Sequence, residues 1–188
     1  MGDRIVAATY LAAAAATGGE VRLTGVEPEH VQTVTELFRQ AGCETGSEAG
    51  GVCLRAPKTL RSTAPVRTAP YPGFPTDAQA PVMAALCLSA GTTVFVENMF
   101  SNRYRHVPEL CRMGADIRTE GRVAVVCGKE SLCGAKVEAH DLRGGAALVV
   151  AALAAKGKSE IKGIVHLDRG YENLVEYMQR LGGQIFRS

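Results

Sequence analysis

Three segments of the chain carry apolar residues, mostly alanine, at nearly every helical position. They are "DRIVAATYLAAAAATGG", "DAQAPVMAALCLSAGTT" and "DLRGGAALVVAALAAKGKS". A helix that is apolar on all sides is typical of one buried against several other elements. Each segment opens with an aspartate whose side chain can accept hydrogen bonds from the first free N–H groups, so we expect helix caps at Asp3, Asp77 and Asp141. The predicted C-terminal stops are three glycines: Gly18, Gly91 and Gly157.

A β-branched stretch and then an amphipathic helix follow each apolar segment. The β-branched stretches, each predicted to be a strand, are "EVRLTGV", "TVFVENM" and "SEIKGIV". The amphipathic segments are "HVQTVTELFRQAG", "RHVPELCRMG" and "YENLVEYMQRLG", and each ends at a glycine. Phe38, Leu110 and Met178 each stand four residues before that glycine, so we expect them on the buried face of their helices.

The first two copies close with a segment that reads as strand, tight glycine turn and strand: "CETGSEAGGVCLRA" and "ADIRTEGRVAVVCG". The last residues, "GQIFRS", are expected to form a closing strand whose partner lies outside this chain. Recurrence at about 70 residues is typical of a repeat architecture. We interpret residues 1–188 as one α/β lobe of a larger protein, with β-α-β-α-β units at roughly 1–60, 66–130 and 135–188, the third incomplete.

Composition and charge exclude several classes of function. The chain is 46% hydrophobic and 21% charged, with a net charge of +2 and interspersed acids and bases. This balance gives no general electrostatic attraction for nucleic acid or an anionic membrane, so an anion site would have to be local. The longest apolar run, "YLAAAAAT", is too short to span a bilayer.

The six cysteines form no CxxC pair and no Cys/His spacing typical of a metal site. They are Cys43, Cys53, Cys87, Cys111, Cys127 and Cys133. We expect free thiols in a reducing cytoplasm, and no metal.

Polar residues gather at the predicted helix starts of the second and third units. The set is Asp77, Arg103, Arg105, His106, Asp141, Arg143, Asp168 and Arg169. Helix N-termini favour anions, and arginines add bidentate donors for carboxylate or phosphate. The first unit offers Glu27 and Glu29 instead. This end of the lobe is therefore predicted to bind an anionic ligand.

The stiff loop "TAPYPGFPTDAQAP" delivers a single carboxylate, Asp77, to a helix start. An aspartate there is most often only a cap, and that interpretation is favoured for Asp3. For Asp77 a structural and a functional role stay equally open, because the four prolines around it restrict the backbone. The run "GGAALVVAALAAKG" indicates core packing, since it lacks the Lys-Ser/Thr ending of a phosphate loop.

Four motifs together closely resemble the enolpyruvyl transferases, and within that family the members that act on a UDP-sugar. They are "RTAPYPGFPTDAQAP", "SNRYRHVPELCRMGA", "HDLRGGAALVVAALAAKG" and "HLDRGYENLVEYMQRLGG", in the family's order, and the resemblance covers essentially all 188 residues. It implies one lobe of a two-lobed inside-out α/β barrel, with three β-α-β-α-β-β repeats per lobe. The other lobe, which would carry the mobile catalytic loop, is absent, so none of the six cysteines is assigned to catalysis.

The resemblance implies roles for single residues. Asp77 resembles the carboxylate that contacts the sugar's 3-hydroxyl and acts as its general base. Arg103 resembles an active-site arginine between the lobes. Arg143 and Arg169 resemble the arginines that hold phosphoenolpyruvate, and Asp141 the acid beside them. The remaining position in this set is Met99, which resembles the residue whose backbone helps to hold the UDP-sugar.

The implied partners are UDP-N-acetylglucosamine, phosphoenolpyruvate and the second lobe of the same polypeptide, with no cofactor, metal, nucleic acid or membrane. The implied process is synthesis of a peptidoglycan precursor in the cytoplasm. We expect the isolated chain to be inactive. Two alternatives stay open: a lobe of the shikimate-pathway enolpyruvyl transferase, and a non-catalytic binding module built from repeats.

Overall fold

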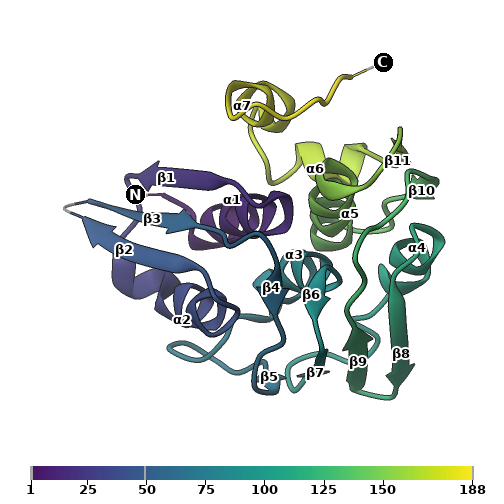
Figure 1. Ribbon diagram of the computed structural model, residues 1–188, viewed down its shortest axis with the longest axis horizontal. Coiled ribbons are helices and arrows are strands. Elements are labelled where there is room, and N and C mark those ends of the chain that lie inside the picture. The colour runs from purple at the N-terminus through teal and green to yellow at the C-terminus, as the bar shows by residue number, and fades with distance from the viewer. Residues whose placement is uncertain (1, 49, 188) are drawn as a thin grey trace.

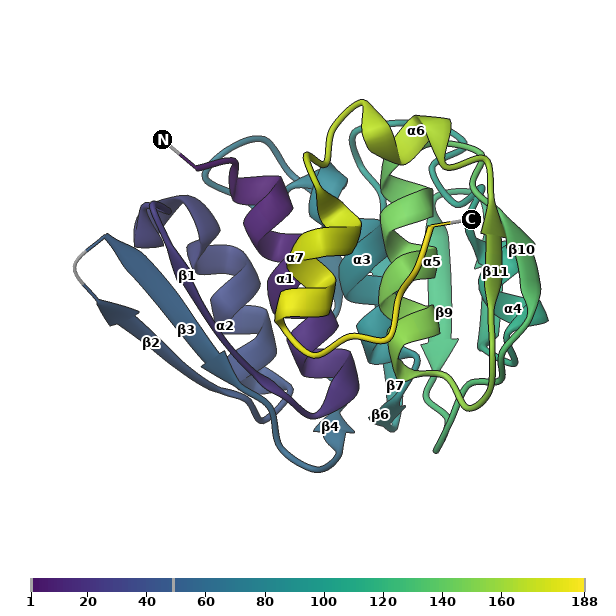
Figure 2. The same cartoon turned by 90° about the horizontal axis from the view of Figure 1, so that it is seen from above.

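Three helices form the centre of the computed structural model, which describes residues 2–48 and 50–187. They are α1 (Arg4–Thr17), α3 (Thr76–Leu86) and α5 (Leu142–Ala154). They run side by side and contact one another, end-on in Figure 1 and lengthwise in Figure 2. Because their small alanine side chains let the backbones approach closely, most of their residues are buried. The prediction of three apolar core helices is confirmed.

Two of the three predicted caps are confirmed. Asp3 accepts hydrogen bonds from the backbone N–H groups of Ile5 and Val6, and Asp141 accepts one from Gly144. The cap at Asp77 is wrong. Pro75 is the N-cap of α3, so Asp77 lies inside the first turn, and its carboxylate pairs with arginines instead.

Only one of the three predicted glycine stops is confirmed. Gly18 ends α1 in the left-handed conformation, with φ 68°. The other two are wrong, because their helices end earlier. After α3 ends at Leu86 the chain first enters the short strand β6 (Ser89–Ala90), and α5 ends at Ala154. Gly91 and Gly157 keep positive φ angles, but in the connections to the next strands.

An antiparallel sheet and a mixed sheet flank the helical centre (Figure 1). One has the order β1-β3-β2; its strands are β1 (Glu20–Thr24), β2 (Glu44–Glu48) and β3 (Gly51–Arg55). The other has the order β5-β7-β9-β8; its strands are β5 (Val66–Arg67), β7 (Thr92–Val96), β8 (Asp116–Glu120) and β9 (Val123–Cys127). In this mixed sheet β5 pairs in parallel with β7. The pairs β2/β3 and β8/β9 are antiparallel neighbours, which confirms the predicted strands of both segments; residue 49, in the first predicted turn, lies outside the described residues.

Two short parallel pairs complete the sheet structure. β4 (Leu60–Arg61) pairs with β6, and β10 (Lys136–Glu138) pairs with β11 (Glu160–Lys162). The three central helices therefore form the inside of the molecule, and the strands lie outside them (Figure 1). The division of the lobe into three equivalent repeat units stays a prediction.

The amphipathic helices are confirmed in all three places. They are α2 (Gln32–Gln40), which follows the 3-10 turn η1 (Pro28–Val31), α4 (Val107–Arg112) and α7 (Leu174–Arg180). Each is followed by a glycine with φ between 93° and 98°. Phe38, Leu110 and Met178 are buried as expected, at 0%, 0% and 2% exposure.

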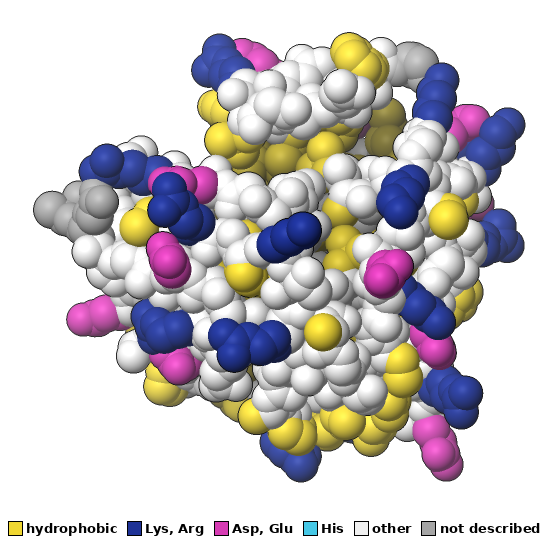
Figure 3. All heavy atoms as spheres, viewed as in Figure 1, with side chains coloured by type: hydrophobic (Ala, Val, Ile, Leu, Met, Phe, Trp, Pro, Cys, Tyr) yellow, Lys and Arg dark blue, Asp and Glu magenta, His cyan; other side chains and the backbone are white. Residues whose placement is uncertain are grey.

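The predicted closing strand at "GQIFRS" is wrong for the part that the structure describes. Residues 183–187 have no strand structure, because no neighbouring strand in the described chain offers them a hydrogen-bonding edge. The preceding helix α7 lies across the top of the helical centre, with apolar side chains gathered beneath it (Figures 1 and 3). Its segment exposes Tyr177, Leu181 and Phe186.

Candidate functional site

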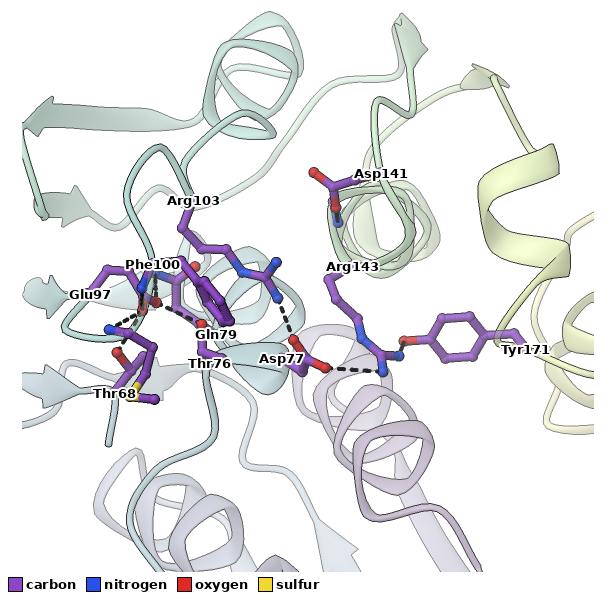
Figure 4. Close-up of polar contacts among 12 residues, drawn as sticks. Thr68, Thr76, Asp77, Gln79, Glu97, Phe100, Arg103, Asp141, Arg143 and Tyr171 are labelled. Atoms are coloured by element: carbon purple, nitrogen blue, oxygen red, sulfur yellow. Dashed lines mark hydrogen bonds and ion pairs between the residues drawn. The ribbon is translucent and has the colours of Figure 1, made fainter. Parts of the chain in front are cut away.

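The starts of α3 and α5 and the loop before α4 meet around one carboxylate, that of Asp77 (Figure 4). Arg103 Nη2 lies 2.5 Å from Asp77 Oδ1, and Arg143 Nη2 lies 3.3 Å from Asp77 Oδ2. Each carboxylate oxygen thus has its own guanidinium donor. The three side chains are 41%, 23% and 14% exposed, in the order Asp77, Arg103, Arg143, so the cluster is open to solvent on the carboxylate side.

The proline-rich loop holds Asp77 by folding back on itself before α3 begins. Ala69 N–H donates to Phe74 O, and Gly73 N–H donates to Pro70 O. A Cβ on Gly73 would lie only 2.6 Å from Ala69 Cβ, so the turn closes only around a glycine. Phe74 anchors the loop in the core at 8% exposure. The loop is therefore rigid through its own contacts and not only through its prolines.

The hydroxyl groups of Tyr171 and Thr9 form a chain of hydrogen bonds that holds the Arg143 side chain in place. Its Nη1 donates to Tyr171 Oη at 3.3 Å, and its guanidinium carbon lies 5.7 Å from the centre of the Tyr171 ring. The Thr9 hydroxyl donates to Ile5 O, so in its 2.8 Å contact with Tyr171 it must act as the acceptor. This sequence of bonds fixes Arg143 against α1. Tyr171 was not among the predicted site residues, since nothing local in the sequence pairs it with Thr9.

Arg103 lies in a loop whose conformation is set on both sides. The Phe100 ring stands beside it, with its centre 5.6 Å from the guanidinium carbon (Figure 4), a favourable cation–π distance. Met99, predicted to offer backbone groups to a sugar, is 39% exposed. Its N–H already donates to Glu97 Oε1, so its carbonyl is the backbone group it can offer to a ligand.

Asp141 and His106 support the start of α5. The Asp141 carboxylate accepts the Gly144 N–H at 2.7 Å, and Figure 4 shows it apart from the Asp77 cluster. Burial lowers the pKa of His106 to about 4; the nearby Asp141 opposes this shift, and Arg103 adds to it. The imidazole is therefore neutral at pH 7. A Cβ on Gly144 would come within 3.1 Å of His106 Cβ, so the small residues of "DLRGG" serve close packing.

Arg169 does not join the Asp77 cluster. We predicted Asp168 and Arg169 at a helix start, and this is wrong: they end the short helix α6 (Val165–Asp168), a separate turn before α7. Asp168 forms a two-point ion pair with Arg187. Arg169 is exposed, and within residues 2–48 and 50–187 it makes no hydrogen bond or ion pair with Asp77.

Neither a metal-binding cluster nor a membrane-spanning helix is found among the described residues. Among them, no group of three or more His, Cys, Asp or Glu side chains is arranged to hold a metal ion. No helix in the described chain is both long and apolar enough to cross a bilayer.

A family profile described as EPSP synthase (3-phosphoshikimate 1-carboxyvinyltransferase) matches residues 1–178. The chain belongs to the EPSP synthase family. Its membership confirms the resemblance to enolpyruvyl transferases that the four motifs indicated.

Several relatives within the EPSP synthase family are named UDP-N-acetylglucosamine 1-carboxyvinyltransferase. The one from Novosphingobium aromaticivorans is 50% identical over 187 residues, which are 100% of this chain and 44% of that protein. The one from Desulfofundulus thermocisternus is 50% identical over 186 residues, which are 99% of this chain and 76% of that protein. The chain thus spans less than half the length of the Novosphingobium relative.

Solved structures of an enolpyruvyl transferase and of an EPSP synthase share the fold. The enolpyruvyl transferase NikO from Streptomyces tendae matches with a TM-score of 0.87 at 25% identity, over 100% of this chain and 44% of that one. An EPSP synthase from Acinetobacter baumannii matches with a TM-score of 0.76 at 21% identity, over 98% of this chain and 46% of that one. The α/β fold of this chain is therefore that of a part of the enolpyruvyl transferases.

Proposed function

We propose that this chain is one lobe of a cytoplasmic enzyme that moves the enolpyruvyl group of phosphoenolpyruvate to the 3-hydroxyl of UDP-N-acetylglucosamine and releases phosphate. The product is a precursor of peptidoglycan. The observation that carries the proposal is the Asp77 carboxylate held between Arg103 and Arg143, in a chain 50% identical to proteins named for this activity. A second lobe in the same polypeptide completes the site, and the isolated lobe is inactive.

Asp77 is the proton acceptor of the proposed reaction. The sugar hydroxyl gives its proton to the Asp77 carboxylate while its oxygen bonds to C2 of phosphoenolpyruvate, and C3 gains a proton from an acid of the second lobe. The tetrahedral adduct then loses phosphate from C2 and a proton from C3, which restores the double bond. Holding the hydroxyl, the base and C2 in line supplies much of the acceleration of such an addition.

Arg103 and Arg143 bind the anionic substrate in this proposal. Phosphoenolpyruvate carries a carboxylate and a phosphate, and guanidinium groups match both with paired N–H donors. These anions compete with Asp77 for the two arginines, so their binding releases the Asp77 oxygens to accept the sugar hydroxyl. Arg169, exposed at the end of α6, is the third anion-binding residue.

The sugar nucleotide lies against the loop that precedes α4. The exposed Met99 offers its carbonyl oxygen to the sugar in this proposal. Asp141 acts in this proposal by fixing the start of α5, and hence Arg143, through its bond to the Gly144 N–H.

A second acceptor is favoured by one observation, the description of the matching family profile as a 3-phosphoshikimate 1-carboxyvinyltransferase. That enzyme class uses the same phosphoenolpyruvate chemistry on a different hydroxyl. The relatives at 50% identity carry the UDP-sugar name, which favours the UDP-sugar.

The test is phosphate release by the complete enzyme, meaning this chain and the second lobe in one polypeptide. Phosphoenolpyruvate is supplied with either UDP-N-acetylglucosamine or shikimate 3-phosphate. We expect release with the UDP-sugar only. Turnover with shikimate 3-phosphate alone would establish the second candidate, and turnover with neither would overturn both.

A further inference from the structure

A buried carboxylate that the sequence did not single out lies next to the site. Glu97, directly after β7, is 1% exposed. A buried ionised carboxylate is strongly destabilising unless its oxygens accept hydrogen bonds. Within residues 2–48 and 50–187 its hydrogen-bond donors are all neutral groups, so ion pairing does not explain why an acid stands there.

Each oxygen of Glu97 holds a different part of the site (Figure 4). Oε1 accepts the backbone N–H groups of Met99 and Phe100, at 2.8 and 3.1 Å, and the Thr68 hydroxyl at 2.9 Å. Oε2 accepts the Thr76 hydroxyl at 2.9 Å, with Gln79 Nε2 at 3.5 Å. Oε1 therefore fixes the loop that leads to Arg103, and Oε2 fixes the first turn of α3.

The residue held by Oε2 is the immediate neighbour of Asp77. Thr76 is the first residue of α3, and Asp77 is the second. The loop held by Oε1 carries Arg103, whose guanidinium meets Asp77 at 2.5 Å. One buried carboxylate thus connects the two backbone segments whose side chains form this ion pair.

A second set of bonds reinforces the connection. The Thr68 hydroxyl that donates to Glu97 also accepts the Asn98 N–H at 2.8 Å, and Asn98 Nδ2 donates to Thr68 O at 3.1 Å. Arg122 Nη1 donates to Asn98 O at 3.0 Å. The loop is consequently anchored at its root, while Met99 and Phe100 beyond it remain partly exposed.

We propose that Glu97 is a positioning residue for the reaction: it sets the place of Arg103 and of the Met99 carbonyl relative to Asp77. The inference rests on the proposed function. A carboxylate suits this place because five groups from three segments donate to it, and the two backbone N–H groups on Oε1 can only donate. The isosteric amide in Glu97→Gln would turn an NH₂ group toward one set of these donors and so release one side of the connection.

The first readout does not depend on activity. Hydrogen exchange of the backbone amides of Met99 and Phe100 is measured in the complete protein, with Glu97→Gln against the matched control Glu120→Gln, an exposed glutamate at the end of β8. The same measurement covers the Asp77 and Ala78 amides in the first turn of α3, beside the Thr76 hydroxyl that Oε2 accepts. We expect exchange to become about 10-fold faster or more in Glu97→Gln only, in whichever of these two pairs of amides the new NH₂ group releases, with β9 amides unchanged. Unchanged exchange in both pairs would overturn the proposal whatever the enzyme does.

The second readout separates positioning from simple stability. With the complete enzyme held well below its melting temperature, Glu97→Gln should lower kcat by roughly 10-fold to 100-fold with a smaller change in KM. If Glu97 acts by placing Arg103, the double variant Glu97→Gln/Arg103→Ala should have a kcat within about twofold of Arg103→Ala alone. Effects that multiply would overturn the placing of Arg103 by Glu97, and a kcat for Glu97→Gln like that of wild type would overturn the positioning role as a whole. If the wild type turns over neither acceptor, the proposed function fails, and the exchange result still reports separately on the loop.

Discussion

The Asp77 carboxylate lies 3.3 Å from the guanidinium of Arg143, a residue 66 positions later in the chain. The contact joins the first turn of α3 to the first turn of α5, and Arg103 completes it from a third segment. An acid placed between an arginine at a helix start and an arginine in a neighbouring loop can exchange partners with an incoming anion.

Arg143 should bind the anionic substrate directly, whereas Tyr171 should only orient the Arg143 side chain. In the complete enzyme, Arg143→Ala should weaken phosphoenolpyruvate binding by roughly 2–4 kcal/mol, because charge-assisted hydrogen bonds are lost in a closed site. Tyr171→Phe removes the acceptor of Arg143 Nη1 but keeps the ring, so it should weaken binding by about 1 kcal/mol or less. Calorimetric titration measures both. Equal effects from the two variants would contradict this division of roles.

His106 should make the fold sensitive to mild acid. Burial lowers its pKa from 6.5 to about 4, so the unfolded chain takes up a proton at a higher pH than the folded chain does. The free energy of unfolding should therefore fall as the pH drops from about 6.5 to about 4, by roughly 3 kcal/mol in total. Above pH 7 His106 should have no effect on the pH dependence of the free energy of unfolding.

The matched variant for this prediction is His106→Asn, which has no titrating side chain. Urea unfolding of both proteins at several pH values isolates the histidine, since carboxylates titrate alike in the two. The difference in slope between wild type and variant should be about 1.4 kcal/mol per pH unit in this window. Parallel curves would show that His106 is not buried in its neutral form.

The cysteines should separate into reactive and protected thiols. Burial raises the pKa of Cys87 to about 12 and that of Cys43 to about 11, and both side chains are buried. Cys111 and Cys133 are exposed. A brief pulse of alkylating reagent, followed by mass spectrometry, should label the exposed pair in the folded protein, and the buried pair only after denaturation. Labelling of Cys87 under native conditions would contradict its place in the core.

Local pattern was sufficient to predict the core and part of the site. The apolar segments became the central helices, and Phe38 and Leu110 are buried as their spacing indicated. Asp77, Arg103 and Arg143 were singled out by their places at helix starts, and the structure brings them together. These features depend on periodicity and turn chemistry, which a sequence shows directly.

The remaining features depend on contacts between distant segments. Glu97 follows a strand as an ordinary surface acid would, and only the approach of Thr68 and Thr76 buries it. The cap predicted at Asp77 was wrong because Pro75 is the N-cap and Asp77 is already the second residue of the helix. Arg169 was placed at a helix start because the sequence does not reveal that α6 is a separate turn.

The central claim is that Asp77 accepts the proton of the substrate hydroxyl, and Asp77→Asn in the complete enzyme tests it most directly. The side chain is 41% exposed and is not the helix cap, so the free energy of unfolding should change by less than about 1 kcal/mol. Turnover should fall on the order of 100-fold or more, with a smaller change in UDP-sugar affinity, because the proton acceptor is gone. Steady-state kinetics and thermal melts are measured on the same preparations. A variant that melts much earlier while its folded fraction turns over at the wild-type rate would contradict the account.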